Sequence, residues 1–334
     1  MKARNLLVVL LVLAVLAAGC AAAPAPAGGG ASGKPLRVAV VMPSAITDQS
    51  FSQSMWQALQ KVQKDMGGPS AMEIKYTENM TKVPDAAAAL RDYATQGFDL
   101  VIAHGSQFIA PAAEVAKDFP KVTFMWGTDT KTFDLPNVYA YTPAAEEGGY
   151  VQGVMAALLS KNKQIGVTGP VEVGDAKSYV NGFLQGVTAT DPSVKVSKTW
   201  TGSFSDVALM SEAAKTHIAA GADVLTGSSQ ASVGSINAAK EKGNVLWFGL
   251  QADQASLAPK NVVSSTAYDW APLLKQAIAD RKAGKPGGQS YVLHLNNDGL
   301  KMALNPEYKL PDNVKKAADA AIDGIKKGTI KVNP

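Results

Sequence analysis

The chain has 334 residues, 46% of them hydrophobic, and a formal net charge of +4. A single hydrophobic core rarely extends over so long a chain, so length and composition predict a globular protein of two domains. The charge is close to neutral, and no block of lysines and arginines with interleaved aromatic residues occurs, which argues against nucleic acid as a partner.

The N-terminus predicts an exported lipoprotein. Lys2 and Arg4 precede an apolar run at residues 6–16, and small residues lead from it to Cys20. The run is too short to span a bilayer and has the flanks of a signal peptide. Cys20 stands where a bacterial lipobox needs it, so we expect cleavage after residue 19 and a diacylglycerol on the thiol. The alternative is an ordinary cleaved signal with an unrelated cysteine.

Cys20 is the only cysteine, which excludes an intramolecular disulfide framework. The following residues, up to 34, are Ala, Gly, Pro and Ser with one lysine, and they cannot bury enough apolar surface to fold. Residues 20–34 are therefore predicted to be a flexible tether. It would hold the body, from about residue 35, on the extracytoplasmic side of a membrane in the cell envelope.

Strand-like and helix-like segments alternate through the body. The apolar run at 36–42 predicts a buried parallel strand, and the spacing of apolar residues over 51–66 predicts a helix. Further strands are expected at 73–76, 100–103, 122–126, 165–168, 195–200, 223–225 and 245–248. Helices are expected at 86–96, 111–118, 146–160, 176–188, 207–219 and 232–242. This alternation indicates an α/β protein with parallel sheets covered by helices on both faces.

An internal near-repeat indicates two similar lobes. Residues 97–100 (GFDL) match residues 221–224 (GADV), and each segment continues through a strand to a Gly-Ser pair. In both halves the next strand ends in an aromatic residue followed by glycine. Three matches in the same order predict two lobes in tandem, and two facing lobes form a cleft.

Ligands of open α/β sheets lie beyond the carboxyl ends of the strands. The loops expected there are 43–51, 105–108, 126–129, 169–179, 227–230 and 249–253, which contain Ser, Gln, Asp and aromatic residues. Such a site would hydrogen-bond a neutral or weakly polar ligand and stack a flat one. Phe51 and Trp126 are the aromatic candidates, and the alternative for each is a place in a lobe core.

No catalytic pattern occurs in the sequence. The three histidines, His104, His217 and His294, are far apart, and HExxH, CxxC, GxSxG and the glycine-rich phosphate loops are absent. We therefore expect a binding protein without cofactor or metal, with a hydrolase as the alternative from a different class.

Several segments resemble the basic membrane protein (BMP/PnrA-like) family. They are 34–56 with the motif TDQSFSQS, 98–105, 114–122 (EVAKDFPKV), 146–153 and 238–243 (AAKEKG), and the resemblance extends over about 36–327. It implies a type I periplasmic-binding-protein fold, with two doubly wound parallel-sheet lobes joined by a three-segment hinge. It also implies an ABC importer, whose permease and ATPase would be partners, and purine nucleosides or nucleobases as ligands.

The resemblance assigns some site residues. Phe51 matches the family's phenylalanine that stacks on the base, Asp48 lies in the same motif, and Tyr179 falls near the expected second stacking aromatic. Gln251 stands where nucleoside binders of the family carry the aspartate that holds the ribose hydroxyls. The lysine expected within 264–270 is absent, and that segment ends in an Asp-Trp pair, at Trp270, which resembles a branch with adenine binders. A free base or comparable heterocycle is therefore expected rather than a nucleoside.

These observations define the expected architecture and site. Lobe one is predicted to contain 35–142 and 263–296, and lobe two 143–262 and 297–334. The ligand would be clamped by Phe51 and by Trp126 or Tyr179, with hydrogen bonds from other cleft residues. Those residues are Ser106, Ser228 and Gln251, the acceptors Asp48 and Asp253, and Trp270 as a further contact. A ligand-sensing lipoprotein of the same fold stays open as an alternative to transport.

Overall fold

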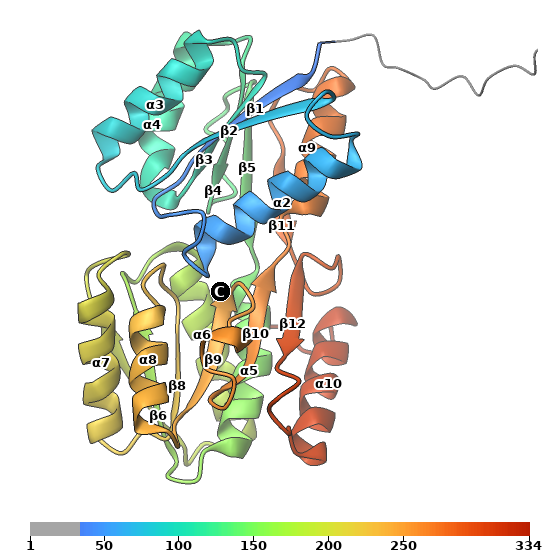
Figure 1. Ribbon diagram of the computed structural model, residues 1–334. Helices are drawn as coiled ribbons and strands as arrows, with labels where there is room; N and C mark the ends of the chain where they lie inside the picture. Colours follow the sequence, from blue (N-terminus) through green and yellow to red (C-terminus); the bar gives the residue numbers. More distant parts are fainter. Residues whose placement is uncertain (1–33) are drawn as a thin grey trace, which may run out of the picture. The chain divides into compact units, whose positions relative to one another are not determined.

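The computed structural model describes residues 34–334, so Cys20, the signal peptide and almost all of the tether lie outside the described residues. The described chain forms two six-stranded sheets (Figure 1). The first has the order β11-β5-β4-β3-β1-β2, and all its strand pairs are parallel. Its strands are β1 (Leu36–Val41), β2 (Met72–Thr77), β3 (Leu100–His104), β4 (Thr123–Gly127), β5 (Val138–Pro143) and β11 (Ser290–Leu293).

The second sheet repeats this arrangement with the order β12-β10-β9-β8-β6-β7. Its pairs are parallel except for β10 with β12, which is antiparallel. Its strands are β6 (Gln164–Gly169), β7 (Lys195–Trp200), β8 (Val224–Gly227), β9 (Leu246–Gln251), β10 (Val262–Tyr268) and β12 (Leu300–Leu304). The two matching sheets agree with the tandem lobes that the internal near-repeat predicts.

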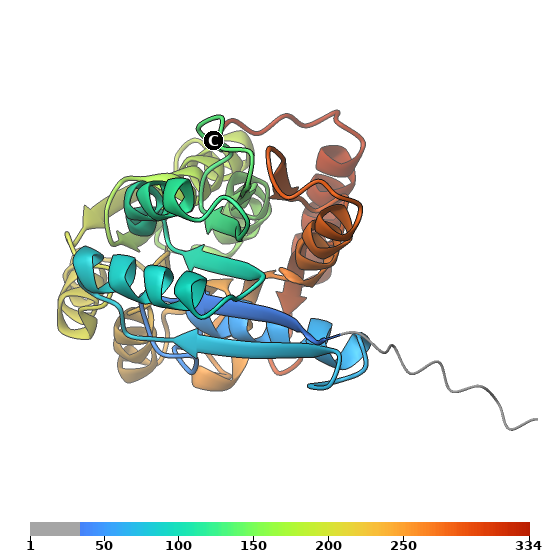
Figure 2. The ribbon, with the colours of Figure 1, turned by 90° about the horizontal axis from the view of Figure 1, so that it is seen from above.

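Helices cover both faces of each sheet (Figures 1 and 2). The first sheet carries α2 (Phe51–Asp65) and α9 (Ala271–Lys282) on one face and α3 (Val83–Thr95) and α4 (Ile109–Asp118) on the other. The second carries α5 (Ala145–Leu159), α6 (Gly174–Thr190) and α10 (Asp312–Lys326) on one face. The helices α7 (Val207–Ala219) and α8 (Val233–Lys242) lie on the other. The predicted doubly wound α/β class is confirmed.

The alternation of side chains along β1 shows why both faces need helices. Val38 and Val40 point into the core cluster shared with α2, whereas Ala39 and Val41 point into the cluster shared with α3 and α4. Successive residues of a strand face opposite sides, so an apolar residue at every position requires cover on both. This is the physical basis on which the continuous run at 36–42 predicts a buried parallel strand.

One boundary of the predicted lobes is wrong. Residues 263–268 were expected in lobe one, but β10 pairs with β9 and β12 and so belongs to the second sheet. The reason is that six of the seven β10 residues are buried, which requires a central place between two strands. The chain therefore crosses after Tyr268, and α9 with β11 forms the return to the first lobe.

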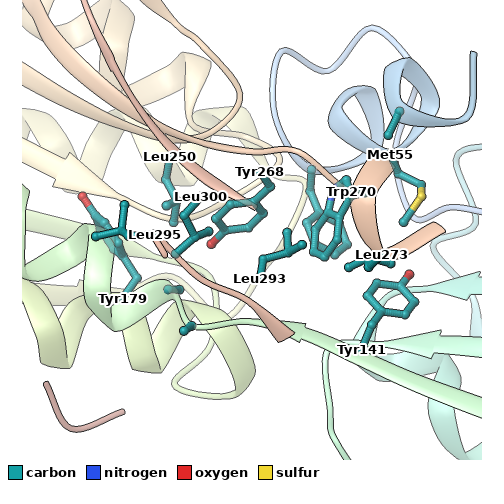
Figure 3. Packing of buried hydrophobic residues seen from close by; sticks show 14 of the residues in the cluster. Met55, Tyr141, Tyr179, Leu250, Tyr268, Trp270, Leu273, Leu293, Leu295 and Leu300 are labelled. Carbon is teal, nitrogen blue, oxygen red and sulfur yellow. The ribbon is translucent and has the colours of Figure 1, made fainter. Parts of the chain in front are cut away.

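Apolar packing continues from one lobe to the other through these crossings. Figure 3 shows Tyr268, Trp270 and Leu293 between Met55 and Tyr141 of the first lobe and Tyr179 and Leu250 of the second. Within residues 34–334, no helix combines the length and apolar character needed to cross a bilayer.

Candidate ligand-binding site

A cavity lies between the carboxyl ends of the two sheets. Its empty volume is about 310 Å³, including the part open to solvent, so this value is an upper limit for the enclosed space. The first lobe contributes Phe51, Gly105, Ser106, Gln107 and Thr128, and the second contributes Pro170, Asp175, Ala176, Phe204, Ser228, Ser229, Gln230 and Gln251. This is the position at which open α/β sheets bind ligands.

Phe51 begins α2 and lines the cavity with its ring held from behind. The ring stacks on His104 with centroids 3.8 Å apart and an angle of 8°, and Trp270 meets it edge-on at 6.1 Å. His104 Nε2 lies 3.1 Å from the Phe51 carbonyl oxygen, and Nδ1 lies 2.7 Å from the Tyr141 hydroxyl. Because His104 covers one face of the Phe51 ring, only the remaining surface is available to a ligand.

His104 is fully buried, and this burial lowers the pKa of its imidazole to about 3. The ring is therefore neutral at physiological pH. Neutral imidazole carries one N–H, so the simplest assignment is donation from Nε2 to the Phe51 carbonyl and acceptance at Nδ1 from the Tyr141 hydroxyl.

Gln251, Ser106 and Ser228 line the cavity, and Gln251 also joins the lobes. Its Oε1 accepts a hydrogen bond from the Ser50 hydroxyl, and its Nε2 donates to Asp175 Oδ2 at 3.4 Å. Within residues 34–334, the hydroxyls of Ser106 and Ser228 make no hydrogen bond to another residue. They are therefore available to a ligand.

Asp48 is not among the residues that line the cavity. Its carboxylate accepts hydrogen bonds from the Ser44 hydroxyl at 2.6 Å and from the backbone N–H groups of Ser50, Ser52 and Gln53 at 2.8–3.1 Å. Burial raises the pKa of this carboxyl group, against the lowering effect of these donors. The contacts place Asp48 as the residue that holds the loop before α2.

The two other aromatic candidates belong to the lobe interiors. Trp126 is buried in the first lobe, and its indole N–H donates to the Lys131 carbonyl at 2.9 Å. Tyr179 is buried in the second lobe, where its hydroxyl donates to Gln152. Neither residue lines the cavity. For Trp126, the structure therefore shows the alternative reading, a place in the core of its lobe.

Asp253 and Trp270 also lie outside the cavity lining. Asp253 is exposed and accepts from the Ala255 backbone N–H at 3.0 Å. Trp270 is fully buried, donates to the Ser54 hydroxyl at 2.8 Å, and packs edge-on against Phe51. Its contact with the site is therefore indirect.

Sequence reasoning missed Asp175, the one carboxylate that lines the cavity. It lies in the first turn of α6 and accepts from Thr128 at 3.2 Å, from Tyr268 at 3.3 Å and from Gln251. Burial raises its pKa, and these donors lower it. An acidic residue directly after Gly174, at the start of a predicted helix, was the available signal.

Phe204 and Gln230 were missed as well. Phe204 is the second aromatic residue of the cavity lining, and it lies in the segment that follows β7. Gln230 lies in the loop between β8 and α8. Gln230 falls within the expected loop 227–230, and Phe204 lies shortly after the strand expected at 195–200, but no spacing rule assigns either side chain to the cleft.

Solved structures show the same fold. A solute-binding protein of an ABC transporter from Aeropyrum pernix K1 matches with a TM-score of 0.79 and 20% identity, covering 90% of this chain and 94% of its own. One from Conexibacter woesei matches with a TM-score of 0.72 and 24% identity, covering 89% and 98%. These likenesses confirm the type I periplasmic-binding-protein fold.

The family model described as ABC transporter substrate-binding protein PnrA-like matches residues 36–333. The chain belongs to this family. A purine-binding protein of Brucella abortus is 31% identical over 263 residues, which cover 79% of this chain and 73% of the relative. A nucleoside-binding ABC transporter protein of Lactococcus lactis is 28% identical and covers 97% and 98%. The predicted family is confirmed, and with it the role of an extracytoplasmic substrate-binding protein of an ABC transporter.

Proposed function

We propose that this family member captures a purine-like nucleobase, or a similar flat heterocycle, between its lobes and delivers it to an ABC permease and ATPase. The observation that carries the proposal is the lining of the cavity. It combines two aromatic residues, Phe51 and Phe204, with one carboxylate, several amides and hydroxyl groups. Aromatic faces hold a flat ring, and the polar groups fix its orientation.

The side chain of Gln251 favours a base over a nucleoside. Its amide is already bonded to Ser50 and Asp175, and it offers no carboxylate to vicinal ribose hydroxyls.

The relatives support a ligand of this class without separating base from nucleoside. The Brucella relative is named for purine binding, and the Lactococcus relative for nucleoside binding. Purine nucleoside binding is therefore the second candidate, favoured by the nearly complete coverage of the Lactococcus protein.

Calorimetry with adenine, guanine, xanthine and their nucleosides tests the proposal, after mass spectrometry of whatever co-purifies with the protein. We expect the bases to bind more tightly than the nucleosides. Tight nucleoside binding with negligible base binding would favour the second candidate, and binding of only a sugar or an amino acid would refute both. Recovery of a hydrolysed nucleoside would instead indicate a hydrolase.

We also propose that Cys20 anchors the protein to the outer side of the bacterial membrane through a lipid. The support is the order of a positive segment, an apolar run and small residues before the only cysteine. Mass spectrometry of the native protein should find a chain that begins at Cys20 and carries a diacylglycerol. Cys20→Ser should move the protein from the membrane fraction to the soluble fraction, and an unmodified chain with a different start would contradict the anchor.

Transport and sensing differ in their partners. A permease and an ATPase encoded beside this protein would support import, whereas an adjacent histidine kinase would support a ligand-sensing lipoprotein. Uptake of radiolabelled ligand by cells with and without the protein distinguishes the two functions directly.

A further inference from the structure

Gln230 presents an unsatisfied acceptor at the cavity. Its Oε1 is buried and has no hydrogen-bond partner in the described chain, although the residue lines the cavity. The surrounding turn is otherwise satisfied, because the Ser229 hydroxyl donates to the Phe204 carbonyl and accepts from the Ala231 N–H. A buried acceptor without a donor is costly, so the structure provides a place for a donor from outside the chain.

Asp175 is a second acceptor in the same lining. Thr128, Gln251 and Tyr268 donate to its two oxygens at 3.2–3.4 Å, which are long hydrogen bonds. None of the residues that line the cavity is Lys, Arg or His, and Asp175 makes no salt bridge in the described chain. A carboxylate has about four acceptor positions, so it retains capacity for one more donor.

We propose that Asp175 and Gln230 each accept a hydrogen bond from an N–H group of the ligand. The site would then select heterocycles with N–H donors at two separate positions, such as an exocyclic amine and a ring N–H. It would refuse anionic ligands, because Asp175 has no cation beside it. This inference rests on the proposed function and specifies which members of the ligand class bind.

Selection for ligands with both N–H donors follows from the free-energy cost of leaving a buried acceptor unpaired. A ligand without one of the donors leaves a buried acceptor unpaired, whereas a matching ligand satisfies both. Sites that hydrogen-bond a substrate group reject analogues lacking that group far more strongly than apolar pockets reject a missing methylene. Adenine carries both donors. In 6-methylpurine a methyl group replaces the amine, and in 9-methyladenine a methyl group replaces the hydrogen of the ring N–H.

The test combines these three ligands with two variants in calorimetry of the full purified protein. In the wild type, adenine should bind roughly 10- to 100-fold more tightly than either analogue, the range expected for one unpaired buried acceptor. With Gln230→Met, adenine should bind no more tightly than one of the two analogues, while its preference over the other analogue is unchanged. With Asp175→Asn, the two analogues should exchange these roles. Gln276→Met and Asp298→Asn, at exposed positions outside the cavity, are the matched controls and should leave all three affinities unchanged.

The outcomes separate the inference from the function on which it rests. If wild-type protein binds all three ligands equally, or if each variant weakens all three by the same factor, the acceptor roles are wrong while heterocycle binding stands. If no heterocycle binds, the proposed function fails and the inference fails with it. The wild-type comparison needs no substitution, so the inference stays testable even if a variant does not fold.

Discussion

At the scale of single residues, Phe51 combines a place at the cavity with fixed orientation. The stack on His104 and the edge contact with Trp270 leave the ring little freedom. Phe51→Ala should weaken ligand binding about tenfold, because it removes stacking worth about 0.5–1.5 kcal/mol in addition to apolar contact. Phe133→Ala is the control, since Phe133 is 52% exposed and does not line this cavity. Equal affinities of wild type and Phe51→Ala by calorimetry would remove Phe51 from the site.

His104 makes stability depend on pH. Its folded-state pKa of about 3 lies below the unfolded value of about 6.5, so the unfolded chain binds more protons between these values. The contribution of His104 is complete above pH 6.5 and falls with pH, by about 2 kcal/mol between pH 6.5 and pH 5. Burial also lowers the pKa of His217, whereas the hydrogen bond to Glu147 raises the pKa of His294. These two histidines therefore affect the pH dependence of stability in opposite directions.

Urea unfolding of wild type and His104→Gln at pH 7.5, 6 and 5 isolates the contribution of His104. The variant is expected to be less stable at pH 7.5, but its free energy of unfolding should fall less steeply with acidification. Parallel curves for the two proteins would show that His104 does not stay neutral in the folded state.

At the scale of elements, α5 and α6 pack with their backbones in contact. A Cβ atom on Gly149 or Gly153 would lie 2.3 or 2.2 Å from a carbonyl oxygen of α6, and one on Gly182 or Gly186 would lie 2.0 or 2.1 Å from α5. Glycines four residues apart on both helices permit this approach. The packing also positions the start of α6, where Asp175 lies.

Gly153→Ala should therefore destabilise the fold, by about 1–3 kcal/mol, because the helices must separate to admit a methyl group. Thr188→Ala is the matched control on α6, where the side chain is exposed and alanine is the better helix former. Guanidinium unfolding midpoints measure both effects. A Gly153→Ala protein as stable as the wild type would mean that the two helices are not held at this distance.

The elements that can be predicted from sequence are those whose hydrophobic pattern is complete within a few neighbouring residues. The runs at 36–42 and 100–103 are apolar at nearly every position, which is sufficient to identify buried parallel strands. The strand β10 was assigned to the wrong lobe because its sequence, VVSSTAY, is compatible with either sheet. Its neighbours, β9 and the distant β12, determine its place, and such long-range pairing leaves no local signal.

The candidate site, like β10, depends partly on features that leave no local signal in the sequence. The cavity lies among the loops expected at the strand ends, because sheet topology dictates that edge. Which side chains in those loops face the cavity depends on backbone direction within a few residues. Asp175 and Tyr179 lie one helical turn apart on α6, yet only Asp175 lines the cavity while Tyr179 points into the core.

At the scale of the whole folded body, residues 35–334, three chain crossings connect the lobes, after β5, after β10 and between β11 and β12. Contacts also join the lobes directly across the cleft. The Ser50 hydroxyl shares its one hydrogen between Gln251 Oε1 and the Ser229 carbonyl, which lies 3.1 Å away, and the Gln254 side-chain amide donates to the Gln49 carbonyl at 3.3 Å. We propose that the crossings form a hinge and that these contacts close the cleft over the ligand.

Small-angle X-ray scattering with and without ligand tests this hinge. The radius of gyration should decrease on binding, because few crossings and polar cleft contacts permit an open state without ligand. Ser50→Ala should weaken the closed state, since it removes bonds to both Gln251 and Ser229. Identical scattering curves with and without saturating ligand would contradict closure.

The central claim, that the cleft between the lobes binds a flat nitrogen heterocycle, is tested most directly by calorimetric titration of the purified protein with adenine and adenosine. We expect one adenine site per chain, with adenosine weaker by at least about tenfold because the Gln251 amide offers no carboxylate to the ribose hydroxyls. Tight binding of adenosine with no measurable binding of adenine would contradict it.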